Sequence, residues 1–317
     1  MRKEEIAYLR DAMKQQTIGV EIEMNHITRE KAAKVAAEFF GTNQYKYTAA
    51  TNGYFAWSAW DQFGREWKFM RDVSIHGDND HKCEMVTPIL YYKDIPMLQE
   101  VVRKLRKAGA ISNPHNGCGV HIHIGADGHT PQSLRNLVNI MASHEELLTN
   151  ALWISQHRVD QYCQVVNHDF LERLNMVKPK TMESLKQIWY EGNHATYGQD
   201  QHYNTSRYHM LNLHATFTKG TIEFRLFQFD NPTHSRKGGL HAGQLKTYIQ
   251  LCLAMSARAK VVKTANPKKR AIVDTKAKYA MQQWLVQLGM CGDEFDTARR
   301  ILTERLTGTY ERANNVA

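Results

Sequence analysis

Three short segments of this chain place pairs of polar, chemically active side chains two residues apart. The pairs are two carboxylates, two imidazoles, and a carboxylate with a guanidinium: Glu21 and Glu23, His121 and His123, and Glu223 and Arg225. Large apolar residues alternate with them. Because successive strand residues point to opposite faces, each pair shares one face while its apolar neighbours enter the core. If the three strands are neighbours in one sheet, their polar faces merge into a surface that binds metal ions and anions.

Each pair also has an ordinary structural explanation. The two glutamates could face solvent on an edge strand, and a histidine on an apolar strand is more often a hydrogen-bonded core residue than a ligand. Gly119 and Gly125 flank the histidine pair, and glycine lets a ligand or another backbone approach closely. Glu223 and Arg225 could form a cross-strand salt bridge. Arg225 nevertheless stands between two apolar residues, and an enclosed guanidinium prefers a carboxylate or phosphate partner.

Two further carboxylates, Asp72 and Glu84, extend the candidate set. Asp72 ends the second strand of a predicted hairpin, and Glu84 is the charged position of a short strand. Taken alone, each is an ordinary surface residue. With them the inventory becomes rich in carboxylates, and hard oxygen ligands favour Mg²⁺ or Mn²⁺ over Zn²⁺. Several carboxylates can hold two such ions, which would neutralise a triphosphate.

Arg207, Arg225 and His123 could supply the remaining contacts to a triphosphate. The sequence contains no GxxxxGKS/T loop, so a bound nucleotide would not be held by a P-loop. No serine or cysteine nucleophile motif is present either. The chemistry that this set of residues indicates is metal-assisted phosphoryl transfer to an acceptor positioned by the protein.

Composition indicates a folded protein of one large or two modest domains. The chain has 317 residues, of which 42% are hydrophobic and 23% charged, as in ordinary globular proteins. Its net charge of +9 favours polyanionic partners, and nucleotide phosphates satisfy this as well as nucleic acid does. The five cysteines contain no CxxC pair, which argues against a disulfide framework and favours a reducing compartment.

The sequence carries no targeting or membrane signal that we recognise. The first residues, Met1–Glu5, lack the apolar run of a signal peptide. No stretch approaches the roughly 20 apolar residues that span a bilayer. We therefore expect a cytoplasmic protein with no membrane partner.

Apolar periodicity and turn residues predict an α+β fold. The expected strands cover 17–24, 54–60, 67–73, 83–89, 119–125, 208–217 and 221–229. The expected helices cover 28–40, 94–107, 130–152, 239–259, 275–288 and 293–306. Several strands are linked as hairpins, which indicates a mostly antiparallel sheet with helices packed against it. Residues 156–206 and the basic segment 260–270 have no assigned role.

The motifs together resemble the amidoligase branch of the carboxylate–amine ligase superfamily, which includes glutamine synthetase and glutamate–cysteine ligase. The resemblance covers residues 17–255, and its five motifs occur in family order: Gly19–Glu23, Trp67–Ser74, Glu84–Leu90, Gly119–Gly125 and Arg207–Arg225. One departure is Thr87, which stands where many relatives have serine. This change is conservative and leaves the resemblance intact.

The resemblance implies a curved, mostly antiparallel sheet with helices on one face, like the catalytic domain of glutamine synthetase. Its concave face would bind ATP and divalent metal ions. In such ligases ATP phosphorylates a substrate carboxylate, and an amine displaces phosphate from the acyl phosphate to give an amide. The substrates would be glutamyl-like molecules, peptides or proteins. We expect residues 1–260 to form the ligase domain and 261–317 a helical extension packed on it.

Metal-binding roles follow from the resemblance by motif position. Glu21, His121 and Glu223 would bind the metal that bridges the ATP phosphates. Glu23 and Glu84 would bind the second metal.

The resemblance also implies roles around the phosphates. Asp72 would lie near the second metal, and His123 would contact the nucleotide. Arg225 and Arg207 would stabilise the transferring phosphoryl group and the acyl phosphate.

Other functional classes stay open at this point. A histidine pair on a strand with a downstream glutamate also suits a barrel metalloenzyme, either a zinc hydrolase or a non-haem iron enzyme. That interpretation leaves Glu21, Glu23 and Arg225 unexplained. A nucleic-acid-binding protein would use the +9 charge and the basic segment 260–270, but no RNA-recognition, zinc-finger or helix-turn-helix signature accompanies them.

Two further questions concern catalytic activity and the pairing of the sheet across subunits. A family member without catalytic activity would be expected to lack one of the metal-binding side chains, whereas this sequence contains every side chain that the reaction requires. The sheet could pair across subunits in a homo-oligomer, as in glutamine synthetase, or close within one chain.

Overall fold

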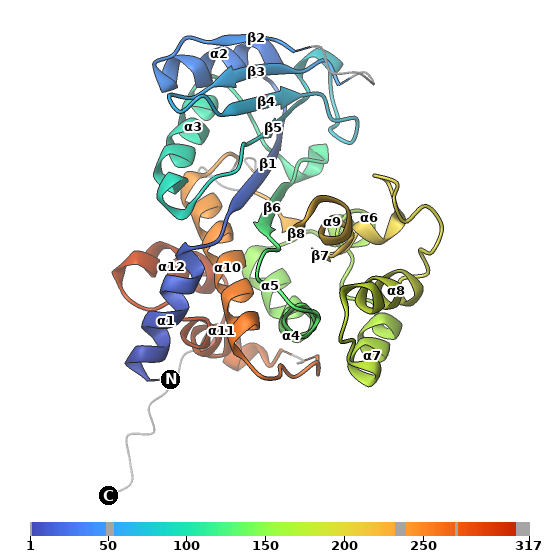
Figure 1. Ribbon diagram of the computed structural model, residues 1–317. Helices are drawn as coiled ribbons and strands as arrows, with labels where there is room; N and C mark the ends of the chain where they lie inside the picture. Colours follow the sequence, from blue (N-terminus) through green and yellow to red (C-terminus); the bar gives the residue numbers. More distant parts are fainter. Residues whose placement is uncertain (1, 49–53, 232–238, 270–271, 309–317) are drawn as a thin grey trace, which may run out of the picture.

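The centre of the protein is one open, antiparallel β-sheet. The computed structural model describes residues 2–48, 54–231, 239–269 and 272–308 (Figure 1). Its eight described strands lie in the order β2-β3-β4-β5-β1-β6-β8-β7, and every neighbouring pair is antiparallel. They are β1 Ile18–Met24, β2 Tyr45–Tyr47, β3 Trp57–Trp60, β4 Glu66–Met70, β5 Cys83–Val86, β6 Val120–Gly125, β7 Leu211–Asn212 and β8 Thr221–Phe227. The predicted α+β class is confirmed, and the described strands do not close into a barrel.

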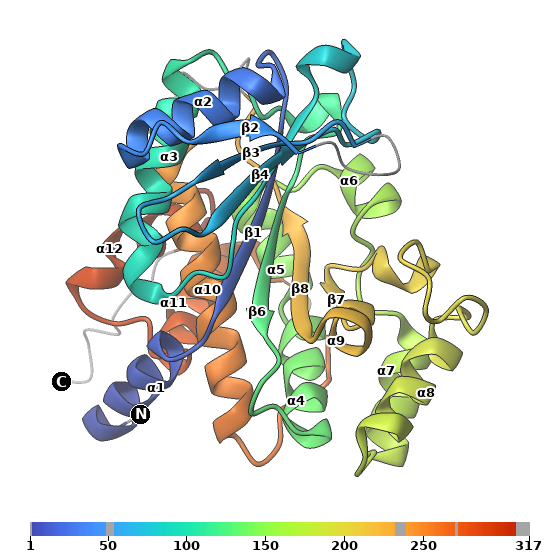
Figure 2. The same cartoon turned by 45° about the horizontal axis from the view of Figure 1, so that its top comes forward.

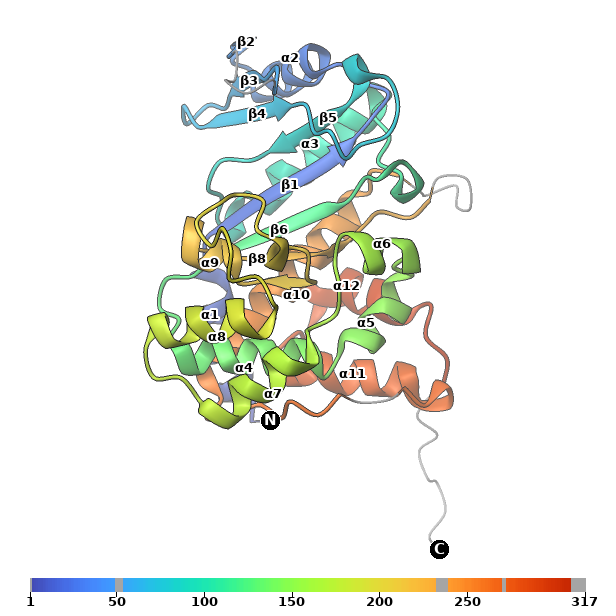
Figure 3. The same cartoon turned by 90° about the vertical axis from the view of Figure 1, so that its right-hand side faces the viewer.

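Helices cover one face of this sheet (Figure 2 and Figure 3). The described α-helices are α1 Lys3–Lys14, α2 Arg29–Phe40, α3 Ile95–Lys107, α4 Pro131–Ala142, α5 Glu145–Leu152, α6 Gln156–Gln161, α7 His168–Val177, α8 Met182–Gly192, α9 His214–Lys219, α10 Ala242–Val261, α11 Ala277–Gln287 and α12 Asp296–Thr303. α2 packs against β3 and β4, α10 packs against β6, and α3 packs between α2 and α10. None of the described helices combines the length and apolarity needed to cross a bilayer.

Alternation in the central strands sorts apolar from polar side chains. The apolar positions of β1, β6 and β8 are at most 2% exposed: Ile18, Val20, Ile22, Met24, Val120, Ile122, Ile124, Ile222, Phe224 and Leu226. These side chains join the core formed with the helix layer. Because side chains alternate between faces, the polar residues between them point to the opposite face.

Helix ends follow the expected local chemistry. The hydroxyl of Thr28 accepts a hydrogen bond from the Lys31 amide at the start of α2, and Gly41 ends that helix in the left-handed conformation with φ 72°. Thr130 caps α4 in the same way, with Pro131 at its first position. Such caps satisfy amides and carbonyls that have no partner within the helix.

The predicted strand over 208–217 is wrong for most of its length. β7 contains two residues, and the chain then forms α9. The side-chain oxygen of Asn212 accepts a hydrogen bond from the His214 amide at 2.8 Å, which turns the chain out of the sheet. Gly220 ends α9 with φ 70° before β8 begins. Apolar alternation over so few residues does not distinguish a strand from a single helical turn.

The predicted helix over 130–152 is interrupted between α4 and α5. At the break, the Ser143 hydroxyl and the His144 ring both bond to the carbonyl oxygen of Ile140. Side chains that bond to the backbone in this way compete with helix continuation. Residues 156–206, which had no clear pattern, contain α6, α7 and α8.

The C-terminal helices pack on the rest of the chain. α12 contacts α10 and α5, and α11 contacts α12. In the preceding basic segment, Lys260 donates to the carbonyl oxygen of Asp127, and Lys269 lies 3.5 Å from Glu145. Arg270 of that segment lies outside the described residues.

Candidate active site

The three polar segments are neighbouring strands, and they present their polar side chains on the face opposite the helix layer. β6 lies between β1 and β8, with β5 on the other side of β1. The register places Glu21 opposite His121, and His123 opposite Glu223. Glu23 lies opposite Glu84. Residues far apart in sequence therefore form one continuous polar surface.

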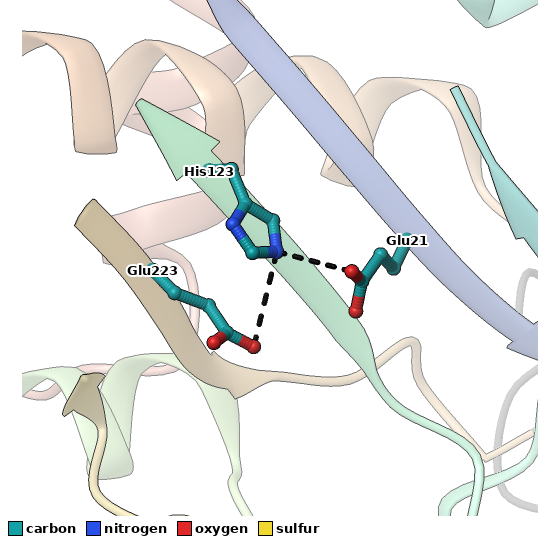
Figure 4. A group of neighbouring side chains, drawn as sticks. All are labelled: Glu21, His123 and Glu223. Atoms are coloured by element: carbon teal, nitrogen blue, oxygen red, sulfur yellow. Dashed lines mark ion pairs between the residues drawn. The ribbon is translucent and has the colours of Figure 1, made fainter. Parts of the chain in front are cut away.

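One cluster joins an imidazole to two carboxylates across three strands (Figure 4). The Nε2 atom of His123 lies 3.2 Å from Glu21 Oε1 and 3.9 Å from Glu223 Oε1. The other ring nitrogen, Nδ1, bonds to the Thr221 hydroxyl at 3.0 Å. Nε2 is buried and makes no hydrogen bond of good geometry within the described chain. An imidazole held at one nitrogen, with the other free beside carboxylates, is the usual arrangement of a metal ligand.

A second cluster contains three carboxylates. Donor atoms of Glu23, Asp72 and Glu84 lie within 4.8 Å of one another. The Gly119 amide donates to Glu23 Oε2 at 2.5 Å, and the Ser74 amide donates to Asp72 Oδ1 at 2.6 Å. Burial, followed by repulsion from neighbouring carboxylates, raises the pKa of Glu84 well above its ordinary value. The cluster thus favours a bound proton or a bound cation.

His121 connects the two clusters. Its Nδ1 lies 2.9 Å from Glu21 Oε2 and 3.7 Å from Glu223 Oε1. It also forms a possible ligand group with Glu21 and Glu84. The motif positions assign His121, together with Glu21 and Glu223, to the first metal ion. In the structure, the histidine whose donor atom lies within 4.8 Å of donor atoms of both Glu21 and Glu223 is His123.

Charge complementarity keeps two of these carboxylates ionised. Burial alone would raise the pKa of Glu21, but the charge of His123 and the hydrogen bond to His121 hold it well below its usual range. Burial likewise opposes ionisation of Glu223, but Arg225 and His123 lower its pKa to about 2. Both carboxylates are therefore available as anionic ligands at neutral pH.

Two arginines lie near these carboxylates in different environments. Arg225 is buried, and its Nη1 donates to Glu223 Oε1 at 2.5 Å. Its buried Nε has no hydrogen-bond partner among the described residues. Arg207 lies with its guanidinium 5.3 Å from the ring centre of Tyr203 and 5.7 Å from that of Tyr208. Its Nη1 donates to the carbonyl oxygen of His202.

A cavity of about 700 Å³ lies over this surface. The predicted site residues that line it are Glu21, Glu23, Asp72, Glu84, His121, Arg207 and Arg225. His123 and Glu223 lie next to it through their contacts with Glu21 and Arg225. The structure thus brings together every residue that the sequence proposed for the site.

The sequence interpretation missed several side chains of the site. Asn212 donates to Glu223 Oε2 at 2.6 Å, and the alternation Leu211-Asn212-Leu213 was the signal that could have identified it. Arg71 and Arg158 also line the cavity. Arg158 belongs to α6, in a segment without a readable pattern, so no sequence signal pointed to it.

A known protein family matches most of the chain. The profile of a family described as "Putative amidoligase enzyme" matches residues 14–256. The chain belongs to this amidoligase family. The matched region of the amidoligase begins in α1, ends in α10 and contains all the site residues described above, whereas α11 and α12 lie beyond it.

Among solved structures, the amidoligase is similar to a bifunctional glutathione synthetase from Pasteurella multocida. The two chains are 13% identical, with a TM-score of 0.49. The alignment covers 95% of this chain and 48% of the other, so the amidoligase spans about half the length of that protein. No curated protein matches the sequence.

Proposed function

We propose that this amidoligase uses ATP with Mg²⁺ or Mn²⁺ to join a carboxylate to an amine through an acyl phosphate. The observation that carries the proposal is the pair of ligand clusters that share β1. Glu21 belongs to one cluster and Glu23 to the other, and these residues lie about 7 Å apart along the strand. Two cations at such adjacent positions suit a triphosphate and its acceptor.

The residues present fit divalent ions. Glu21, His123 and Glu223, with His121 beside them, would hold one ion, and the buried, unbonded Nε2 of His123 supports this assignment within the described chain. The second ion would be held by Glu23, Asp72 and Glu84. Mostly oxygen donors favour Mg²⁺ or Mn²⁺. When bound, such ions neutralise phosphate charge and polarise the oxygens that they contact.

The proposed reaction has two transfers. A carboxylate oxygen attacks the γ-phosphorus of ATP, and the bond from that phosphorus to the oxygen of ADP breaks. The amine nitrogen then attacks the acyl carbon, the carbon–oxygen bond to phosphate breaks, and the amine loses a proton as the amide forms. Arg225 and Arg207 would stabilise the charge that spreads over the transferring phosphoryl oxygens.

We extend the proposal to the domain limits, the substrates and the location of the reaction. Residues 1–260 would form the ligase domain and 261–317 the extension that α11 and α12 begin. The acceptor and amine would be glutamyl-like, peptide or protein substrates. We place the reaction in the cytoplasm and assign no role to nucleic acid.

Calorimetry of ATP binding, with and without Mg²⁺, tests the proposal on wild type, Glu21→Gln and Glu23→Gln. Each substitution removes a charge and preserves shape. We expect Mg²⁺-dependent binding in wild type and its loss in Glu21→Gln. Asp160→Asn is the control, because Asp160 is exposed on α6 and lies outside the cavity described above.

Two results would contradict the proposal. One is the absence of ATP binding by wild type with Mg²⁺ and candidate acceptors present. The other is tightly held zinc or iron in the purified protein, combined with no effect of Mg²⁺ and ATP. That result would favour the metalloenzyme with a histidine pair on a strand.

A screen for the acceptor follows from the same proposal. Phosphate release in the presence of ATP and hydroxylamine, a general amine acceptor, identifies the carboxylates that form an acyl phosphate.

A further inference from the structure

His202 faces the cavity from the segment 156–206, which contributes nothing to the predicted metal site. It lies in the loop 193–204, between α8 and the 3₁₀ turn Thr205–Arg207, and its side chain lines the cavity. The imidazole packs edge-on against the Tyr203 ring, with ring centres 4.6 Å apart. Neither ring nitrogen forms a hydrogen bond or an ion pair within the described chain. His202 therefore presents free ring nitrogens to a ligand in the cavity.

Hydrogen bonds fix the loop of His202 relative to the metal ligand Glu223. Asn212 donates to Glu223 Oε2 at 2.6 Å, and the side-chain oxygen of Asn212 accepts from the His214 amide at 2.8 Å. The His214 ring in turn donates from Nε2 to the carbonyl oxygen of Gln201 at 3.1 Å. A continuous series of bonds thus connects the residue before His202 to the first ligand cluster.

Arg207 ties the same loop to the proposed phosphate site. Its Nη1 donates to the carbonyl oxygen of His202 at 3.1 Å, and its guanidinium lies against the Tyr203 ring. Under the proposed function, Arg207 stabilises the acyl phosphate. The hydrogen bond therefore joins His202 to the arginine that would hold the group attacked by the amine.

The surroundings of His202 favour its neutral form. Partial burial and the positive charges of Arg207 and Lys219 lower its pKa below the ordinary value, and the smaller effects of Glu21 and Glu223 oppose this. A neutral imidazole accepts a proton at neutral pH, whereas arginine and lysine side chains already carry theirs. His202 is therefore able to act as a base.

The other acceptors that line the cavity in the described chain are already engaged. Glu66 accepts a hydrogen bond from the Ser58 hydroxyl at 2.7 Å, and the hydroxyls of Tyr54 and Tyr203 bond to each other at 3.1 Å. The side chains assigned to cations are Glu21, Glu23, Asp72, Glu84 and His121. His202 thus combines a free acceptor nitrogen with a pKa suited to proton transfer near neutral pH.

We propose that His202 is the catalytic base that removes a proton from the ammonium group of the incoming amine. This inference rests on the proposed function and assigns a residue to its second transfer. An ammonium group has no lone pair, and transfer of one N–H proton to a ring nitrogen of His202 leaves that pair on the amine. The amine then attacks the acyl carbon, and a second proton goes to the departing phosphate, which leaves as hydrogen phosphate. His202 is exposed and returns its proton to solvent.

Amines of different basicity test this role in the full chain. The carboxylate is one identified by the hydroxylamine screen, and His202→Gln is compared with wild type. Hydroxylamine and methoxyamine are largely unprotonated at neutral pH and need no base, whereas ammonium, methylamine, glycine and lysine are protonated. We expect His202→Gln to keep hydroxamate formation and to lose about 100-fold or more in kcat with the protonated amines, as loss of a general base does elsewhere.

His168→Gln is the matched control, because His168 is an exposed histidine on α7 outside this cavity. The pH dependence with methylamine gives a second readout that a structural role would not change. In wild type and in His168→Gln the rate should level off once His202 is neutral. In His202→Gln it should continue to rise by about tenfold per pH unit, because only the free amine then reacts.

Three results would overturn the inference. Equal losses with hydroxylamine and methylamine in His202→Gln would indicate a defect in folding or in acyl phosphate formation. Unchanged conversion of the protonated amines by His202→Gln would exclude a role as base, and so would a wild-type protein that converts hydroxylamine and none of the four protonated amines. Failure of the proposed function is distinct, because wild type would then form no hydroxamate.

Discussion

Asn212 on β7 holds Glu223 on β8 by a side-chain hydrogen bond of 2.6 Å to Oε2. Arg225 donates to the other carboxylate oxygen, Oε1, at 2.5 Å. Both oxygens of this buried carboxylate are thereby oriented before a ligand arrives. Such outer contacts set the direction of a metal ligand, because an unsupported carboxylate rotates freely.

Replacement of Asn212 by leucine should weaken the metal site. Glu223 would keep Arg225 and lose its second anchor, and removal of an outer contact typically costs about 10–100-fold in metal affinity or activity. Titration with Mn²⁺ measures the effect. Asn175→Leu is the matched control, because the side-chain amide of Asn175 on α7 donates a 2.8 Å hydrogen bond to Asn139 Oδ1 on α4. An equal loss of Mn²⁺ affinity in both variants would contradict the role of Asn212.

Substitution of His123 by alanine should remove one bound Mn²⁺ ion and leave the other. The reason is that His123 belongs to the cluster with Glu21 and Glu223, whereas the carboxylate cluster does not contain it. Asp72→Asn should have the opposite effect and weaken the second ion. Mn²⁺ stoichiometry, measured by calorimetry or electron paramagnetic resonance, distinguishes the two. Unchanged stoichiometry and affinity in His123→Ala would return the metal role to His121.

Arg225→Lys should lower ATP turnover by about 100-fold or more, as removal of a donor to a developing charge does elsewhere. Lysine keeps the charge but cannot reproduce the planar fork that reaches Glu223 and leaves Nε free. Arg65→Lys is the control, since Arg65 bridges Asp61 and Asp94 away from the cavity. We expect it to lower thermal stability with turnover kept. Near-normal turnover of Arg225→Lys would exclude a fork-dependent role.

Glu84 should make stability depend on pH in the absence of metal. Burial and repulsion from Glu21, Asp72 and Glu23 raise the pKa of Glu84 above its unfolded value. Its contribution to the free energy of unfolding is therefore complete below the unfolded pKa and is lost as pH rises through the raised pKa.

Chemical unfolding in EDTA, between about pH 5 and about pH 8, measures this effect. Wild type should lose more stability over this range than Glu84→Gln, which carries no titrating group at 84. Mg²⁺ should reduce the difference, because the ion takes the place of the proton, and its affinity should rise with pH. Parallel profiles for the two proteins in EDTA would contradict the raised pKa.

The sequence by itself indicated which side chains are candidates for the chemistry, and it determined which of them share a face. Strand alternation is a local property of the backbone, so Glu21 with Glu23 and His121 with His123 could be paired before any tertiary structure was known. The same holds for the caps at Thr28 and Thr130, whose hydroxyls bond to amides three residues away. The motif order was sufficient to indicate the amidoligase family and the antiparallel sheet.

Tertiary structure decided the contacts that join distant segments. The register of β1, β6 and β8 places His123 beside Glu21 and Glu223, and this register depends on how whole strands pack rather than on local pattern. Arg158 meets Gly119 because a segment without readable periodicity folds back over the sheet. A pairing of this kind depends on the path of the intervening chain, and side-chain types and spacing alone do not encode that path.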